Sequence, residues 1–174
     1  MSANRISNAG VIDVSNRNFV VGHCEWTPYL FRVEDGLTGV ELDGLSIFTG
    51  RWGGPVTVTI EFAEDDSLQV DDHWQWVVHR PYRPAASDLA VCSIIANTGY
   101  AVDGLTAEGA RSVLVAAMGR DTDRDQVAHN DAERYLIRFL PQPATESRIL
   151  KADDSVGLGF TTPRPRGNID GVSK

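Results

Sequence analysis

Short apolar segments with alternating polar positions recur along most of the chain. In the clearest segment, from Pro55 to Phe62, four apolar residues alternate with Thr57, Thr59 and Glu61. A period of two puts the apolar set on one face of a strand, so this segment predicts a half-buried antiparallel strand. Comparable strand-like segments run over Phe19–Cys24, Tyr29–Val33, Trp74–Arg80, Leu89–Ile95, Arg111–Met118 and Glu133–Leu140.

Turn signals separate these segments. Asp-Gly pairs occur at Asp35-Gly36, Asp43-Gly44 and Asp103-Gly104, and Asp-Gly suits the positive φ angles of two-residue hairpins. Around Asp43-Gly44 the apolar positions change phase, which favours a hairpin or a bulge over one continuous strand.

About eight or nine short strands with regular turns predict an all-β, mainly antiparallel β-sandwich with little helix. A length of 174 residues corresponds to one domain, which we place at residues 1–160, with an extended or mobile tail at 161–174. Helix is expected only in short pieces, for example around Thr106 to Gly109. No apolar run reaches membrane-spanning length and no secretion signal opens the chain, so we expect a cytoplasmic protein without membrane contact.

The charge is acidic and unevenly distributed. The chain carries 24 acidic and 16 basic residues, a net charge of −8. Ten of the acids and a single base, Arg51, lie between Glu34 and Asp72. A protein that tracks a nucleic-acid backbone needs a basic stripe, so this distribution argues against nucleic acid as partner. The acidic stretch is either solubilising surface or a landing site for a basic partner.

The sequence contains no known catalytic or metal-binding motif. Asp121, Asp123 and Asp125 resemble the start of a calcium loop, but Gln126 and Ala132 replace its required glycine and glutamate. Consecutive residues alternate faces in a strand, so Asp71-Asp72-His73 seldom converges on one ion. We therefore expect no metal, no cofactor and no catalytic residue. Cys24 and Cys92 are expected to be reduced thiols, with a single disulfide left open.

A glycine-rich loop with a tryptophan is the strongest candidate for a binding site. Arg51 and Trp52 lie between Gly50 and Gly53-Gly54, and Trp and Arg are enriched at binding hot spots. Trp52 could also fold back onto the core. If the next loop lies at the same end of the molecule, its carboxylates would form an acidic rim around the aromatic anchor. The predicted partner-binding residues are Arg51, Trp52, Glu64, Asp65, Asp66, Asp71 and Asp72.

The order of segments resembles the competence protein J family, small bacterial β-sandwich proteins that inhibit a partner nuclease. The similarity runs from Phe19 to Leu140 and includes Trp26 and the segments Asp43–Phe48, Trp76–Tyr82, Arg111–Met118 and Glu133–Arg138. It implies a stoichiometric inhibitor, such as an immunity protein, in a one-to-one complex with a toxic enzyme. An acidic protein suits a basic active-site cleft, such as that of a nuclease or an NAD-glycohydrolase.

Two other classes of function stay open. A ligand-binding sandwich would use Trp52, Trp74 and Trp76 as a stacking platform for a carbohydrate or another small molecule. An enzyme would need a site assembled from distant residues, as serine–histidine–aspartate triads are. Of these functions, we favour the non-enzymatic inhibitor.

Overall fold

The computed structural model describes residues 6–22, 33, 35–40, 44–65, 67–83, 89–93, 95–102 and 109–161. Within this part of the chain, no helix is long and apolar enough to cross a membrane. The elements are β1 (Ile6–Ser15), β2 (Asn18–Gly22), β3 (Thr38–Val40), β4 (Gly44–Phe48), β5 (Gly53–Phe62), β6 (Trp76–Pro81), β7 (Ala90–Ser93), β8 (Thr98–Ala101), β9 (Ser112–Met118), β10 (Arg134–Leu140), β11 (Arg148–Ala152) and α1 (Ser155–Thr161).

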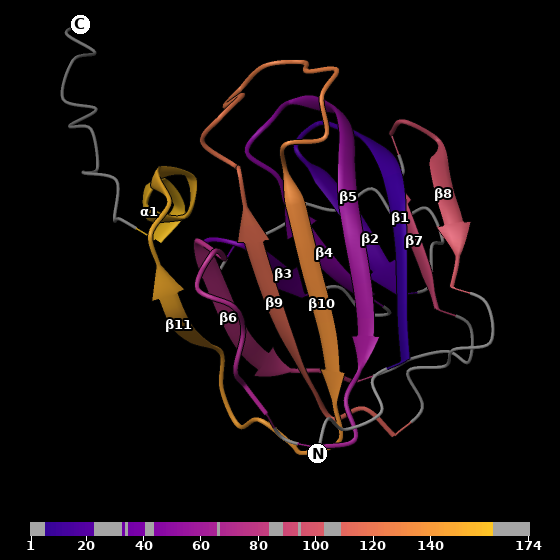
Figure 1. The fold of residues 1–174 in the computed structure, drawn as a ribbon, viewed down its shortest axis with the longest axis vertical. Helices are drawn as coiled ribbons and strands as arrows, with labels where there is room; N and C mark the ends of the chain where they lie inside the picture. Colours follow the sequence, from indigo (N-terminus) through magenta and orange to yellow (C-terminus); the bar gives the residue numbers. More distant parts are fainter. Residues whose placement is uncertain are drawn as a thin grey trace, which may run out of the picture.

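The strands form one hydrogen-bonded sheet that curls back on itself (Figure 1). Its order is β11-β6-β9-β10-β5-β1-β2-β4-β3, and β7 joins through β2 and carries β8. Neighbouring strands are antiparallel except β5 and β10, which run parallel. The curl passes through the two-residue turn between β1 and β2, where Asn16 and Arg17 have φ angles of 58° and 64°. Positive φ at both turn positions matches the right-handed twist of a tight hairpin.

The main core lies inside the curl. Val56, Val58 and Ile60 on β5 are completely buried, whereas Thr57 and Thr59 are partly exposed. The core continues through Phe19 on β2 and Trp76 on β6. Alternation along β5 therefore predicts its buried face correctly.

A smaller apolar cluster covers the outer face of β6, β9 and β10. Trp74 lies over Val77, Leu114, Leu136 and other residues of these strands. The connection from β5 to β6 supplies this cover, and Arg138 fastens it by bonding Glu61 at 2.7 Å and the Gln69 carbonyl at 2.7 Å. The described residues 67–75 therefore lie along the sheet rather than extending into solvent.

The predicted all-β class is confirmed. The hydrogen bonds join the strands into one sheet, so they do not separate the two sheets of the expected sandwich. Strands β3 and β4, on either side of the predicted hairpin, pair antiparallel with Val40 as the register partner of Leu45; Asp43 lies outside the described residues. Most of Tyr29–Val33 and of the expected helix at Thr106–Gly109 lies outside the described residues.

Three features differ from the sequence predictions. Helix α1 was not expected, because Gly157 and Gly159 are poor helix formers. Strand β1 was also missed, although it is as long as β5. Cys92 is disulfide-bonded rather than a reduced thiol, and Cys24 lies outside the described residues. Disulfides are typical of oxidising compartments; the cytoplasmic location stays a prediction.

Candidate partner-binding surface

Arg51 and Trp52 are neighbours in the loop between β4 and β5, but one side chain is buried in the protein and the other is exposed to solvent. The side chain of Arg51 is completely buried, whereas Trp52 is 47% exposed. Trp52 is therefore exposed as the predicted aromatic anchor would be, whereas the Arg51 side chain is not accessible at the surface.

The buried guanidinium of Arg51 holds two loops together. Its Nε donates to Glu133 at 3.1 Å, and its Nη1 donates to the carbonyls of Pro55 at 2.8 Å and Asn130 at 2.6 Å. Its Nη2 lies 3.4 Å from Asp123. Glu133 is also buried and accepts hydrogen bonds from the backbone N–H groups of Gly50 and Arg51. The polar groups of Arg51 are thus bonded within the protein, and a contact role for Arg51 stays a prediction that this geometry does not favour.

Trp52 lies beside the loop between β9 and β10. Its backbone N–H donates to the Gln126 carbonyl at 2.8 Å, and the adjacent Gly53 pairs with Val127. Val127 is 62% exposed. The Arg17 guanidinium lies 5.7 Å from the Trp52 ring centre and forms an ion pair with Asp125. Trp52, Val127, Arg17 and Asp125 form an exposed group, the Trp52 tip.

The predicted acidic rim is not around Trp52. Trp52 precedes the first residue of β5, and Glu64 and Asp65 follow the last. Ten extended residues span roughly 30 Å, so these exposed carboxylates lie at the far end of the strand. Asp66 lies outside the described residues. Strand β5 therefore separates Glu64 and Asp65 from Trp52, and their role in partner binding stays a prediction.

Several exposed carboxylates lie along a path from the β5–β6 connection through β11 to the β9–β10 loop. Asp72 accepts a hydrogen bond from Lys151 through its carbonyl at 2.7 Å, and Lys151 lies 3.4 Å from Asp153. Gln75, three residues further, bonds Gly119 at 2.7 Å and so connects this region to the β9–β10 loop. We name the exposed carboxylates along this path the acidic band: Asp71, Asp72, Asp121, Asp125 and Asp153.

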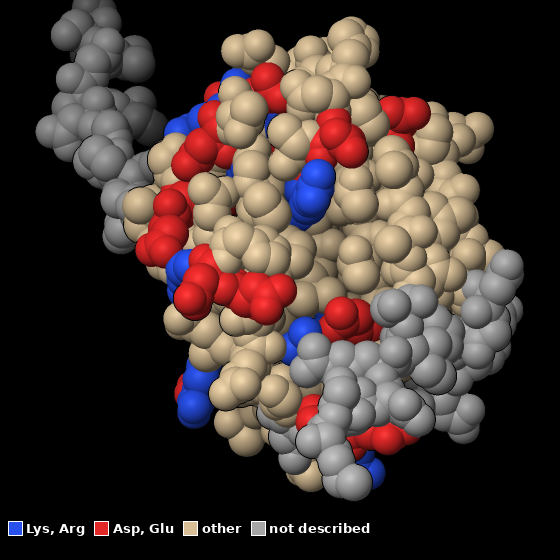
Figure 2. All heavy atoms as spheres, in the orientation of Figure 1, with Lys and Arg blue, Asp and Glu red and all other residues tan. Residues whose placement is uncertain are grey.

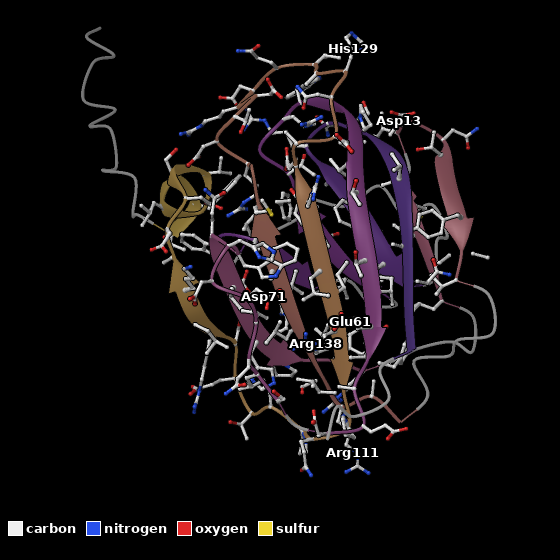
Figure 3. All side chains as sticks on the ribbon, in the orientation of Figure 1. Asp13, Glu61, Asp71, Arg111, His129 and Arg138 are labelled. Carbon is white, nitrogen blue, oxygen red and sulfur yellow. The ribbon has the colours of Figure 1, made fainter. Side chains whose placement is uncertain are left out.

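Charged side chains are unevenly distributed over the face that Figure 2 shows. Acidic side chains gather on the side of β6, β11 and α1 (Figure 2), where Figure 3 places Asp71. The area over β5 and β1 carries few charges. Only Asp71 and Asp72 of the predicted rim belong to the acidic band.

Asp121 connects the acidic band to helix α1. Its carboxylate accepts hydrogen bonds from the Ser155 backbone at 2.9 Å, the Ser155 hydroxyl at 2.7 Å and the Val156 backbone at 3.2 Å. Partial burial acts to raise the pKa of Asp121, but these hydrogen bonds and the charge of Arg120 together lower it below 3.8. Asp121 therefore stays ionised at neutral pH and holds the first turn of α1.

The structure does not form the tryptophan platform of the ligand-binding alternative. Trp76 is completely buried in the main core, and its Nε1 donates to the Asp35 carbonyl at 2.9 Å. Trp74 is 9% exposed and belongs to the outer cluster. These two side chains therefore pack in different clusters, on different faces of the sheet.

One histidine–serine pair bears on the enzymatic alternative. His79 Nε2 lies 3.0 Å from Ser112 Oγ. Burial lowers the pKa of His79 and the nearby charge of Arg148 lowers it further, so the imidazole is neutral at pH 7. Ser112 is completely buried and therefore cannot meet a substrate. Within the described ranges, no group of three histidine, cysteine or acidic side chains could hold a metal ion.

The fold is similar to that of one solved structure. No family model and no curated protein matches the chain. The structure of ComJ, described as the inhibitor of the DNA-degrading activity of NucA from Bacillus subtilis, aligns with a TM-score of 0.57 and 13% sequence identity. The alignment covers 79% of this chain and 98% of ComJ. The resemblance that the segment order indicated is thus confirmed for the fold.

Proposed function

We propose that this protein is a stoichiometric inhibitor that binds a toxic enzyme and blocks its active-site cleft, with a DNA-degrading nuclease as the first candidate and an NAD-glycohydrolase as the second. The observation that carries this proposal is the likeness to ComJ, which extends over 98% of that inhibitor. The net charge of −8 supports it, because enzymes that bind phosphodiesters are positively charged around their clefts.

The proposed contact surface is the Trp52 tip together with the acidic band. A half-exposed tryptophan beside an exposed valine offers an apolar centre, and aromatic residues are enriched among binding hot spots. The acidic band then steers a basic partner toward that centre. The buried Arg51–Glu133 pair contributes by fixing the loop rather than by contact.

Capture from the lysate and secreted fraction of the source cells, at low salt, tests this proposal. The expected result is one partner in equal amount, with a DNA-degrading or NAD-hydrolysing activity that is absent in the complex and returns after release by high salt. A well-folded bait that captures no enzyme, or an enzyme that stays active in the complex, would reject the inhibitor function.

Charge reversal tests the steering role separately. Replacing Asp71 and Asp72 by lysine should slow association several-fold and weaken its salt dependence. The matched control replaces Glu64 and Asp65, two exposed carboxylates at the end of β5 away from Trp52. Equal slowing in both double variants would place the interface elsewhere.

A further inference from the structure

A hollow at the end of the molecule away from the Trp52 tip has the opposite charge character. It has a volume of about 490 Å³ and is lined by Pro81, Tyr82, Arg83, Ala110, Arg111, Pro143, Ala144 and Thr145. The charged groups among these lining residues are the guanidiniums of Arg83 and Arg111. Figure 3 shows Arg111 at the end opposite His129. The described residues that line the hollow therefore make it basic on an acidic protein.

Neither of these arginines is used to build the fold. Arg83 and Arg111 are exposed, and their guanidiniums form no ion pair or side-chain hydrogen bond within the described part of the chain. Arg51, Arg80, Arg120 and Arg138 are buried and paired instead. Two such guanidiniums at one hollow raise the local concentration of anions.

The other residues that line the hollow are mostly apolar and suit the apolar part, or body, of a ligand. Prolines and alanines line the hollow, and the Tyr82 ring packs against Phe139 with centres 5.0 Å apart. Burial raises the pKa of Tyr82 to about 12, so its hydroxyl keeps its proton. Thr145 adds a second hydroxyl. A mostly apolar pocket with a few polar groups is the usual composition of a small-molecule site.

We propose that this hollow binds a small organic phosphate monoester, with its phosphate at Arg83 and Arg111 and its apolar body against Pro81, Tyr82 and Pro143. Charge balance favours phosphate over carboxylate, because a monoester carries nearly two negative charges at neutral pH and the hollow offers two cations. Guanidiniums also bind phosphate oxygens through paired N–H donors. This site is independent of the proposed inhibitor function.

Calorimetric titration of the full chain with phenyl phosphate, inorganic phosphate and benzoate tests the proposal. Phenyl phosphate should bind saturably and lose affinity as salt rises, whereas the other two should bind at least about tenfold more weakly, each lacking one half of the recognition. Equal binding of benzoate would overturn the assignment to phosphate. Equal binding of inorganic phosphate would overturn the proposed contact between the apolar body of the ligand and the hollow.

Arginine substitutions locate the binding. Arg83→Gln and Arg111→Gln should each weaken phenyl phosphate binding about tenfold or more, and both variants should fold normally because both side chains are exposed. The matched control is Arg134→Gln, an exposed arginine at the start of β10, which should leave binding unchanged. Equal losses in all three variants, or no saturable binding by the wild type, would overturn the site.

Discussion

The arginines beside Trp52 and those at the hollow are placed in opposite ways. At the end that carries Trp52, Arg51 and Arg120 are completely buried, and Arg120 binds Asp154 through two nitrogens at 2.8 and 2.7 Å. At the other end, Arg83 and Arg111 are exposed beside a hollow. Residue type alone therefore does not identify a contact residue. A buried, paired arginine shapes a loop, whereas an exposed one beside a hollow is available to a ligand.

The sharpest test of this contrast is Arg51→Met. It leaves Glu133 buried without its cation and should lower the free energy of unfolding by about 3–5 kcal/mol. Urea unfolding followed by tryptophan fluorescence measures it. Arg134→Met is the control and should change the free energy by less than about 0.5 kcal/mol. If both variants lowered the free energy of unfolding equally, the buried Arg51–Glu133 pair would not be what stabilises the end of the sheet that carries Trp52.

Gly54→Ala should have the next largest effect. Gly54 has a φ of 113°, and a Cβ there would overlap the Ala128 carbonyl oxygen. The substitution should therefore cost about 3 kcal/mol or more, by forcing the two loops apart as well as straining the backbone.

Gly109→Ala separates the cost of backbone strain from the cost of overlap with a neighbouring loop. Gly109 has a φ of 85°, but no atom of the described residues lies within 4 Å of the position that a Cβ would take. Only backbone strain of about 1–2 kcal/mol therefore applies. Thermal unfolding of both variants gives the comparison. If Gly54→Ala costs no more than Gly109→Ala, the close packing of the two loops is wrong.

Asp121→Ala should cost about 1 kcal/mol at neutral pH, since it removes the acceptor for the first N–H groups of α1. The folded-state pKa of Asp121 is lowered, so its stabilisation is present above the unfolded pKa of 3.8 and is lost as pH falls through the folded value. The difference from wild type in urea unfolding should therefore shrink as the solution becomes more acidic than the unfolded pKa. A difference that stays constant down to strong acid would contradict the ionised cap.

Trp52→Ala should have the smallest effect on folding. Trp52 is 47% exposed and contacts Arg17 from outside the core, so the free energy of unfolding should change by less than about 1 kcal/mol. Thermal unfolding measures this value. A loss as large as that of Arg51→Met would show that Trp52 is a structural residue and would remove it from the proposed surface.

Local patterns predict the strands better than the site. Alternation of Val56, Val58 and Ile60 marks the buried face of β5, because side chains of a strand point alternately to its two sides. The same strand shows why the carboxylates that follow it do not surround Trp52. Its ten residues place Trp52 and Glu64 at opposite ends, and this separation follows only when the segment from Gly53 is recognised as one extended strand.

The burial of Arg51 is not predictable from its neighbours. Glycines around Arg51 and Trp52 indicate an exposed loop, and the decisive partner, Glu133, lies more than eighty residues away. The failed calcium-loop pattern that begins at Asp121 likewise gives no sign of a contact role, yet this segment supplies Asp125 beside Trp52. Long-range pairing of this kind depends on the sheet order, which periodicity does not determine.

Titration of the captured enzyme with this protein tests the central claim most directly. Enzyme activity, measured as DNA degradation or NAD hydrolysis, should fall linearly to zero at one equivalent of wild-type protein. Trp52→Ala should need at least about tenfold more protein, whereas Leu150→Ala, at an exposed apolar residue on β11, should inhibit as wild type does. Undiminished activity at excess wild-type protein would contradict the inhibitor account, and equal inhibition by Trp52→Ala would contradict the Trp52 tip as its contact.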